Sequence, residues 1–318
     1  SWDYVLDESG RMDDISLRKV KQSIERINRR GYHLPMDPVD FLRKNRLLRD
    51  GKLTFAAEML FAKDWHINTA VQMGFFQTPT IIKDRDEAHG DLVSQVDHIF
   101  EFVKKHINCA VVITGKPEND LVWDYPLDAL REIILNMIVH RDYRSPSESC
   151  VKVFSDYIEF FNPGILPGDI SVDDLVHNRY LSTLRNKAIA NHFHLLGEIE
   201  KYGSGVTRVI QLFRDAGLQE PKFEILGGGL KVTVSSKKVA DKVADKVADK
   251  VADKPEKQSP ARARLLSFVK QNPGCSIGDM MNATGFSDSY VRKNLSILAK
   301  EGEVEHRGSR KTGGYYAE

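Results

Sequence analysis

The stretch that decides the fold is Leu130-Arg-Glu-Ile-Ile-Leu-Asn-Met-Ile-Val-His-Arg-Asp-Tyr143. Its hydrophobic residues recur at the i, i+3, i+4, i+7 and i+8 spacing of a helix that packs on a core. Further hydrophobic residues lie on the other side, so we expect the helix to be buried nearly all round. Glu132, Asn136 and His140 then form a single polar row along the helix, because they are spaced four residues apart.

This polar row requires partners, because a carboxylate and an amide buried without hydrogen bonds cost several kcal/mol. A Mg²⁺–phosphate site is one explanation. The amide oxygen of Asn136 suits the cation, and the carboxylate of Glu132 can orient or deprotonate an attacking water. Hydrogen bonds from the row to a neighbouring loop are the alternative, and the helix alone does not distinguish the two.

Length and composition set the broad class. The 318 residues are enough for two or three domains, and 41% hydrophobic with 29% charged residues is typical of a soluble globular protein. Hydrophobic runs stay below the roughly 20 residues that cross a bilayer, so we expect a cytoplasmic protein without membrane contact. Cys109, Cys150 and Cys275 lack metal-ligand spacing, which fits reduced thiols. A net charge of +1 gives no global argument for nucleic-acid binding.

The first ninety residues are predicted to form a small mixed unit that packs on the next domain. Helical spacing is found at 15–30, 38–46 and 53–62, and strand character at 70–77 and 78–83. Asp13 and Asp14 are the N-cap candidates of the first helix.

Residues 91–236 are predicted to form a second, α+β domain. A helix at 91–106, a buried strand at 108–115 and a hairpin at 150–161 surround the 130–143 helix. A glycine-bearing loop follows at 162–168, then a helix at 186–196. A second glycine loop opens another helix at 199–210, and strands at 223–234 close the domain.

Two further segments complete the chain. Residues 237–258 contain tandem Val-Ala-Asp-Lys repeats, in which every i+4 pair is like-charged and the valine stripe drifts around the axis. We expect a mobile, partly helical spacer rather than a coiled coil. Residues 259–318 follow the order helix, helix, turn, helix, hairpin, which is that of a winged helix-turn-helix.

Three elements of the second domain together indicate a nucleotide site. Glu132-x-x-x-Asn136 lies on a helix, Asn162-Pro-Gly164 follows a strand, and Tyr202-Gly-Ser-Gly205 precedes a helix. Glycines at a helix start let backbone amides approach a phosphate, whose charge the helix N-terminus favours.

This order resembles the Bergerat fold of the GHKL ATPases, an α/β sandwich. Leu135-Asn-Met-Ile-Val-His-Arg-Asp-Tyr143, with Phe161-Asn-Pro-Gly-Ile-Leu-Pro167 and Glu200-Lys-Tyr-Gly-Ser-Gly205, is similar to one bacterial branch. That branch comprises Schlafen-AlbA-type transcriptional regulators, often labelled ATP-dependent DNA helicase-like. The resemblance covers residues 37–235 and implies a DNA-binding module at the C-terminal end. It also implies an N-terminal AlbA-type domain, which we expect to be missing upstream of Ser1.

The resemblance implies ATP and Mg²⁺ as cofactors and assigns roles to single residues. Glu132 would orient the attacking water, Asn136 would ligate Mg²⁺, and Asn162 would contact adenine, followed by Gly164. Gly203 and Gly205 would form the phosphate-side loop.

One departure from the family pattern is Asn162, since the ATPases usually have Asp there and a carboxylate is the stronger acceptor. We can assign no Lys or Arg to the γ-phosphate. Nucleotide binding is therefore better supported than hydrolysis.

Other polar residues fit simpler interpretations. His140, Arg141 and Asp142 could serve general acid–base chemistry, but we favour a cap of the helix C-terminus, where cationic His and Arg interact favourably with the dipole. His192 and His194, at i+2, share no helix face and make a metal pair improbable. The chain contains no Gly-x-x-x-x-Gly-Lys-Ser/Thr loop, which disfavours a helicase proper.

The winged helix carries the candidate DNA contacts. Basic and base-reading residue types cluster on its expected recognition helix and on the wing. These residues are Ser289, Tyr290, Arg292, Lys293, Asn294, Arg307, Arg310 and Lys311. The alternative is a protein-binding winged helix with a solvated charged face.

Our first hypothesis is a transcriptional regulator that binds double-stranded DNA, with an ATP-binding domain that gates assembly or DNA affinity. We expect a homo-oligomer such as a dimer, in which two tethered DNA modules bind by avidity. A nucleic-acid-associated ATPase is the second hypothesis. The third is a nucleotide-free relic of the fold that serves dimerisation.

Overall fold

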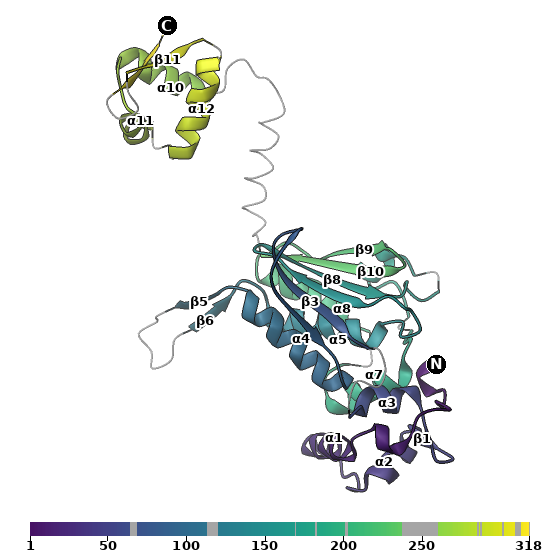
Figure 1. The fold of residues 1–318 in the computed structure, drawn as a ribbon. Helices are drawn as coiled ribbons and strands as arrows, with labels where there is room; N and C mark the ends of the chain where they lie inside the picture. Colours follow the sequence, from purple (N-terminus) through teal and green to yellow (C-terminus); the bar gives the residue numbers. More distant parts are fainter. Residues whose placement is uncertain are drawn as a thin grey trace. The chain divides into compact units, whose positions relative to one another are not determined.

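The computed structural model contains two compact units, Ser1–Val243 and Ala244–Glu318, each of which is described by itself (Figure 1). The described residues are 1–63, 69–112, 120–168, 170–181, 183–200, 203–236, 260–284, 286, 288–300, 302–308 and 313–317. The Val-Ala-Asp-Lys repeats, for which we predicted a spacer, lie outside these residues.

A six-stranded mixed sheet forms the centre of the first unit, which makes the fold α+β. Its neighbours are antiparallel except for one parallel pair, β3 with β7, which needs a long crossover. The spatial order is β4 (Ile81–Ala88), β3 (Val71–Thr78), β7 (Ser149–Val153), β8 (Tyr157–Pro163), β10 (Gly229–Ser235) and β9 (Lys222–Leu226). Because β3 and β4 belong to this sheet, it begins before residue 91, where we expected the sheet domain to start.

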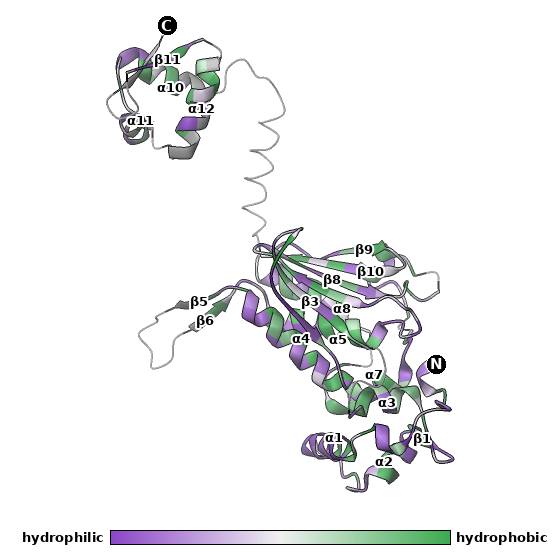
Figure 2. Ribbon diagram, viewed as in Figure 1, coloured by the Kyte–Doolittle hydropathy of each residue, from purple (hydrophilic) through white to green (hydrophobic). Residues whose placement is uncertain are grey.

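Helices cover one face of the sheet. Alternate residues of β7 and β8 are buried, as expected where one face packs on a core. Figure 1 shows the covering helices on the same side, and Figure 2 shows hydrophobic positions in the sheet and in these helices. They are α4 (Leu92–His106), α5 (Leu127–His140) and α8 (Gly205–Asp215), whereas α7 (Lys187–Leu196) packs on the N-terminal helices.

The N-terminal segment shares its hydrophobic core with the sheet and helices. It consists of η1 (Trp2–Tyr4), η2 (Met12–Asp14), α1 (Leu17–Arg29), α2 (Pro38–Lys44), β1 (Leu48–Arg49), β2 (Lys52–Leu53) and α3 (Phe55–Phe61). The prediction of Asp13 or Asp14 as the N-cap of α1 was wrong. Ser16 is the N-cap, because its side chain accepts a hydrogen bond from the main-chain nitrogen of Lys19.

A two-stranded hairpin replaces the buried strand that we predicted at 108–115. Cys109–Val112 (β5) pairs with Asp120–Trp123 (β6) and not with the central sheet. Leu121 and Val122 are 60% and 52% exposed, so this hairpin is a surface feature despite its hydrophobic sequence.

The second unit has a separate small core. Its elements are α10 (Pro260–Gln271), α11 (Ile277–Thr284), α12 (Asp288–Lys300), β11 (Val304–Arg307) and β12 (Gly314–Ala317). Val291, Leu295 and Leu298 place one face of α12 in this core. β11 and β12 are antiparallel, and Tyr315 of β12 also bridges to Cys275 ahead of α11.

No helix within the described ranges is both long and apolar enough to span a membrane.

Candidate functional site

A pocket of the first unit lies between α5, the end of β8 and the start of α8. It is lined by every residue that the sequence assigned to nucleotide or magnesium binding. These residues are Glu132, Asn136, Asn162, Gly164, Gly203 and Gly205. The fold therefore brings together side chains and glycines that are far apart in the sequence.

Glu132 and Asn136 lie one helical turn apart and contact each other. The side-chain nitrogen of Asn136 donates to Oε1 of Glu132 at 3.3 Å, so the side-chain oxygen of Asn136 is the atom oriented for another ligand. Burial raises the pKa of Glu132, while Arg208 and the bond from Asn136 act in the opposite direction. A carboxylate in this setting is a stronger base than an exposed one, as a water-activating group requires.

Gly205 allows α8 to begin directly beside this pair. A β-carbon at this position would lie 2.2 Å from Oε1 of Glu132 and 3.3 Å from the side-chain nitrogen of Asn136. The N-terminal turn of α8 also carries Arg208, a pocket residue that the sequence did not identify. Main-chain N–H groups and a guanidinium at this end of the pocket form a surface suited to an anion.

Asn162 and Gly164, at the end of β8, also line the pocket. Asn162 is 6% exposed, and its side-chain oxygen accepts a hydrogen bond from the hydroxyl of Ser149 at 2.9 Å. Gly164 has φ +114°, a backbone conformation that residues other than glycine rarely adopt. A β-carbon at this position would also lie 3.1 Å from the β-carbon of Asp142. Ser149 was missed in the sequence because its partner lies on the neighbouring strand, 13 residues away.

The segment between Gly164 and Gly203 covers the pocket. It contains α6 (Val172–Val176) and α7, and it supplies Tyr180 and Arg185 to the lining. The hydroxyl of Tyr180 donates to the main-chain oxygen of Gly203 at 3.2 Å, which ties the cover to the glycine loop. The lining also includes Ile165, Leu166, Leu175, Leu184 and Phe223, so the pocket offers apolar as well as polar surface.

His140, the third member of the polar row, lines the pocket as well. Burial, together with the positive charge of Arg185, lowers the pKa of His140 to about 4. The imidazole is therefore neutral at pH 7 and does not supply a cation to the helix dipole.

Arg141 is the C-cap residue of α5, as we predicted, and its main-chain nitrogen donates to the oxygen of Met137 at 3.1 Å. Its guanidinium donates to the main-chain oxygens of Thr69 and Ala70 at 2.9 and 2.8 Å, ahead of β3. The side chain is buried and links the end of α5 to the sheet, because these carbonyls require donors in the core.

His192 and His194 have separate partners. Nε2 of His192 is bonded to the hydroxyl of Ser23, and Nδ1 of His194 to the main-chain oxygen of Ile199. Within the part of the chain that the structure describes, no group of three or more His, Cys, Asp and Glu residues could hold a metal. Asn136 could hold a cation in the pocket together with oxygen atoms of a ligand.

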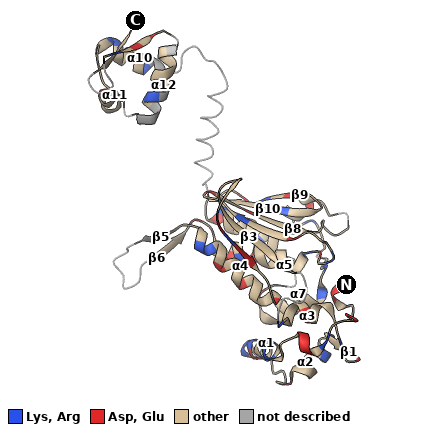
Figure 3. Ribbon diagram, in the orientation of Figure 1, with Lys and Arg blue, Asp and Glu red and all other residues tan. Residues whose placement is uncertain are grey.

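The DNA-contact candidates of the second unit are only partly described. Arg292 on α12 and Arg307 on β11 are exposed, and Figure 3 shows a basic position on α12. The prediction that Asn294 lies on the exposed face of α12 was wrong. Asn294 is 6% exposed and lies on the inner side of that helix. Arg310 and Lys311, and the side chains of Ser289, Tyr290 and Lys293, lie outside the described parts.

Comparison with known families adds an independent finding. The family described as "Putative ATP-dependent DNA helicase recG C-terminal" matches residues 147–234. These residues resemble a GHKL-like ATPase domain. The match runs from β7 to β10 and includes Asn162 and the pocket glycines, whereas Glu132 and Asn136 precede it.

Comparison with whole proteins concerns the fold alone. The chain is similar to the crystal structure of the DIP2311 protein from Corynebacterium diphtheriae, with a TM-score of 0.61 and 20% identity. The similarity covers 100% of this chain and 64% of that one, so this chain spans less than two thirds of its length. No curated protein matches the sequence.

Proposed function

We propose that the first unit binds ATP with Mg²⁺ and that the chain is a DNA-binding regulator whose assembly or DNA affinity depends on that nucleotide. The observation that carries the nucleotide site is the convergence of α5, the end of β8 and the start of α8 on one pocket. The ATPase-like family match at residues 147–234 supports the same interpretation.

The chemistry of the pocket fits a nucleoside triphosphate from end to end. The side-chain oxygen of Asn136 would ligate Mg²⁺, and Gly203, Gly205 and Arg208 would face the phosphates. The apolar side chains of the lining, together with Asn162, would suit a purine base. Glu132 would orient water if the bound nucleotide is hydrolysed.

The experiment that tests this function is calorimetry with ATP and ADP in the presence of Mg²⁺, on the chain and on Asn136→Ala. We expect micromolar binding that the substitution weakens by at least tenfold. Absence of binding to the intact chain would contradict the proposal and favour a nucleotide-free domain that serves dimerisation.

A nucleic-acid-associated ATPase is the second candidate, favoured by the placement of Glu132 beside Asn136. Steady-state release of phosphate that is lost in Glu132→Gln, with ATP binding retained, separates an ATPase from a binding domain.

The DNA-binding part of the proposal concerns the second unit as a winged helix-turn-helix, with double-stranded DNA as its partner. Support comes from the order of its elements, helix, helix, helix, hairpin, and from Arg292 and Arg307 on the outside. Dimeric assembly belongs to the proposal, because two such units would raise the affinity by avidity. Light scattering with and without nucleotide measures the assembly directly.

A further inference from the structure

Helix α7, which lies in the segment covering the pocket, is held at both ends by residues of the N-terminal segment. Asp3 is fully buried, and its carboxylate accepts hydrogen bonds from the main-chain nitrogens of Ala188 and Ile189, at 2.7 and 3.0 Å. At the other end, Arg30 donates to the main-chain oxygen of Leu195 at 2.6 Å. Both ends of a helix carry unsatisfied backbone groups, so these contacts fix α7 to the first thirty residues.

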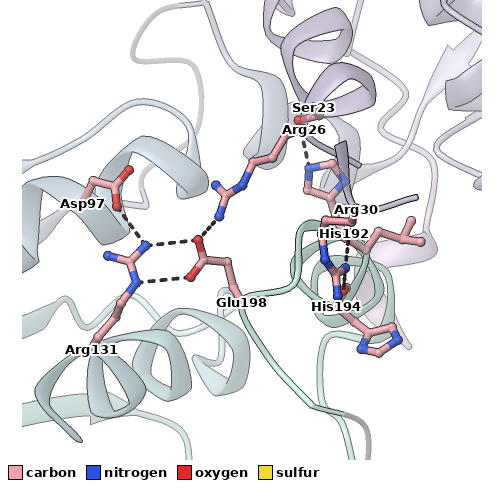
Figure 4. Close-up of polar contacts among 9 residues, drawn as sticks. Ser23, Arg26, Arg30, Asp97, Arg131, His192, His194 and Glu198 are labelled. Atoms are coloured by element: carbon pink, nitrogen blue, oxygen red, sulfur yellow. Dashed lines mark hydrogen bonds and ion pairs between the residues drawn. The ribbon is translucent and has the colours of Figure 1, made fainter. Parts of the chain in front are cut away.

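Glu198, just after α7, forms ion pairs with residues of α1 and α5, and the α5 residue also pairs with α4 (Figure 4). Arg131 of α5 donates from Nε and Nη2 to its two carboxylate oxygens, each at 3.1 Å. Arg26 of α1 contacts the same carboxylate, and Arg131 also reaches Asp97 of α4 at 2.9 Å. Burial raises the pKa of Glu198, but the bonds from both arginines outweigh it and hold the pKa below its ordinary value. The carboxylate, 11% exposed, therefore stays charged and paired.

The turn that carries Glu198 has little freedom to move. Gly197 has φ +80°, and a β-carbon there would lie 2.5 Å from Nε of Arg30. The main-chain nitrogen of Glu198 donates to the oxygen of Phe193 at 3.0 Å, which closes the end of α7. Glu198 lines the pocket, and the chain passes from it to the glycine loop at Gly203.

On α5, Arg131 directly precedes Glu132 in the sequence. The residue that holds Glu198 is thus the sequence neighbour of Glu132, although the two side chains point to different sides of α5. Arg26 adds α1 to this connection, so the N-terminal segment contacts the element that leads into the glycine loop.

We propose that Glu198 is a positioning residue, through which helix α1 sets the glycine loop at Gly203–Gly205 and hence the affinity for nucleotide. The inference rests on the proposed function, because it concerns the same pocket. Removal of Arg26 leaves the carboxylate of Glu198 with Arg131 as its one ion-pair partner in place of two, while Arg30 still holds the end of α7. The N-terminal segment is in this way part of the ligand-binding machinery.

The test compares Arg26→Met, Glu198→Gln and the variant that combines these two changes. Arg29→Met, which changes an exposed residue of the same helix, is the control. We expect Arg26→Met to weaken binding of Mg²⁺–ATP about three- to tenfold, as is typical of coupling residues without ligand contact. Arg29→Met should bind like the wild type, and Arg26→Lys should restore most of the affinity. The double variant should bind no more weakly than Glu198→Gln, since both changes remove the same connection.

Hydrogen exchange without nucleotide gives a readout that does not depend on the proposed function. We expect faster exchange in a peptide covering residues 197–208 of Arg26→Met and unchanged exchange in Arg29→Met. Local acceleration with no ATP binding by the wild type would support the positioning role and contradict the nucleotide site. Unchanged exchange and affinity in Arg26→Met would overturn the inference. So would acceleration spread evenly over α4, α5 and α8, because that indicates a general loss of stability. If Glu198→Gln does not fold, the two Arg26 variants alone decide the test.

Discussion

The hydroxyl of Ser149 donates a hydrogen bond to the side-chain oxygen of Asn162 at 2.9 Å, and both residues are buried. They lie on β7 and β8, on the face of the sheet that the helices cover. With the oxygen engaged, the amide group of Asn162 presents its NH₂ donor to a ligand in the pocket. A carboxylate at this position would present acceptors only, so this pair sets which edge of a base is favoured.

Replacement of Asn162 by Asp should change the base preference of the pocket. ATP carries an amino donor where ITP carries a carbonyl acceptor, and a carboxylate pairs with the donor and repels the acceptor. We expect the ratio of ATP to ITP affinity to rise about tenfold in Asn162→Asp, which corresponds to about 1.4 kcal/mol. Competition calorimetry measures the ratio. Asn191→Asp, an exposed change on α7, is the control, and an equal ratio in all three proteins would contradict the role of Asn162.

Gly205→Ala should reduce nucleotide affinity more than it reduces stability. The added methyl group would meet the end of the Glu132 side chain, which can rotate away, and less closely the side-chain nitrogen of Asn136. We therefore expect a change in unfolding free energy of below about 1 kcal/mol but about tenfold weaker binding of Mg²⁺–ATP. Calorimetry and urea unfolding give the two values.

The matched control is Gly278→Ala in α11, where a β-carbon would have its nearest neighbour at 3.6 Å. That substitution should leave nucleotide binding unchanged and stabilise its helix by about 0.5–1 kcal/mol. Equal affinities of Gly205→Ala and the wild type would show that the close approach of α8 to Glu132 is irrelevant to the ligand.

Local periodicity in the sequence predicted most helices and strands but not the contacts between distant segments. The hydrophobic stripe identified α5, and the i, i+4, i+8 spacing placed Glu132, Asn136 and His140 on one side, where all three line the pocket. The two glycine loops were visible because glycine chemistry is local. The order of strands in the mixed sheet could not be predicted, since the parallel pairing of β3 with β7 depends on residues more than 70 positions apart.

Long-range partners also explain the incorrect predictions. The cap position of Arg141 was predicted but the partners of its side chain were not, because nothing near it in the sequence indicates the carbonyls of Thr69 and Ala70. Asn294 lies among polar residues of α12, and its burial depends on how that helix rotates against its core. A hydrophobic run such as that in β5 predicts a strand but does not state which sheet the strand joins.

Arg141→Met should be among the more destabilising single changes in the first unit. It leaves the main-chain oxygens of Thr69 and Ala70 without their donor in a buried environment. We expect a loss of about 2–4 kcal/mol. Tryptophan fluorescence in urea reports on the first unit, because all 3 tryptophans precede residue 124. Arg144→Met, which removes an exposed pair with Asp142, should cost far less, and an equal loss in both variants would contradict this assignment.

Stability of the first unit should fall as the pH is lowered through the range of its buried histidines. Burial, and next the charge of Arg26, lowers the pKa of His192 from 6.5 to about 4. The unfolded state binds the proton more readily, so the contribution of this residue is complete above pH 6.5 and is lost progressively toward pH 4. The total is about 3 kcal/mol as an order of magnitude. In His192→Gln, urea unfolding at pH 8, 6 and 5 should show lower stability at pH 8 and a shallower decline, because His140 still titrates. An unchanged slope would mean that His192 is accessible to protons in the folded state.

DNA binding by the second unit should depend on Arg292 and on salt. A guanidinium that neutralises a phosphate releases a counterion, so each such contact adds about 0.9 to the slope of log affinity against log salt. We expect Arg292→Ala to weaken binding of a labelled random-sequence duplex about three- to tenfold at low salt and to reduce the slope by about one. Fluorescence anisotropy from 50 to 200 mM salt measures both quantities. Lys270→Ala, an exposed change on α10, is the control, and its binding should match the wild type. Equal losses in both variants would indicate a diffuse charge effect, and no duplex binding at 50 mM salt would favour a winged helix used for protein contacts.

Repeating the titration with Mg²⁺–ATP then shows whether occupancy of the first unit changes the DNA affinity of the second, which the proposed regulator requires.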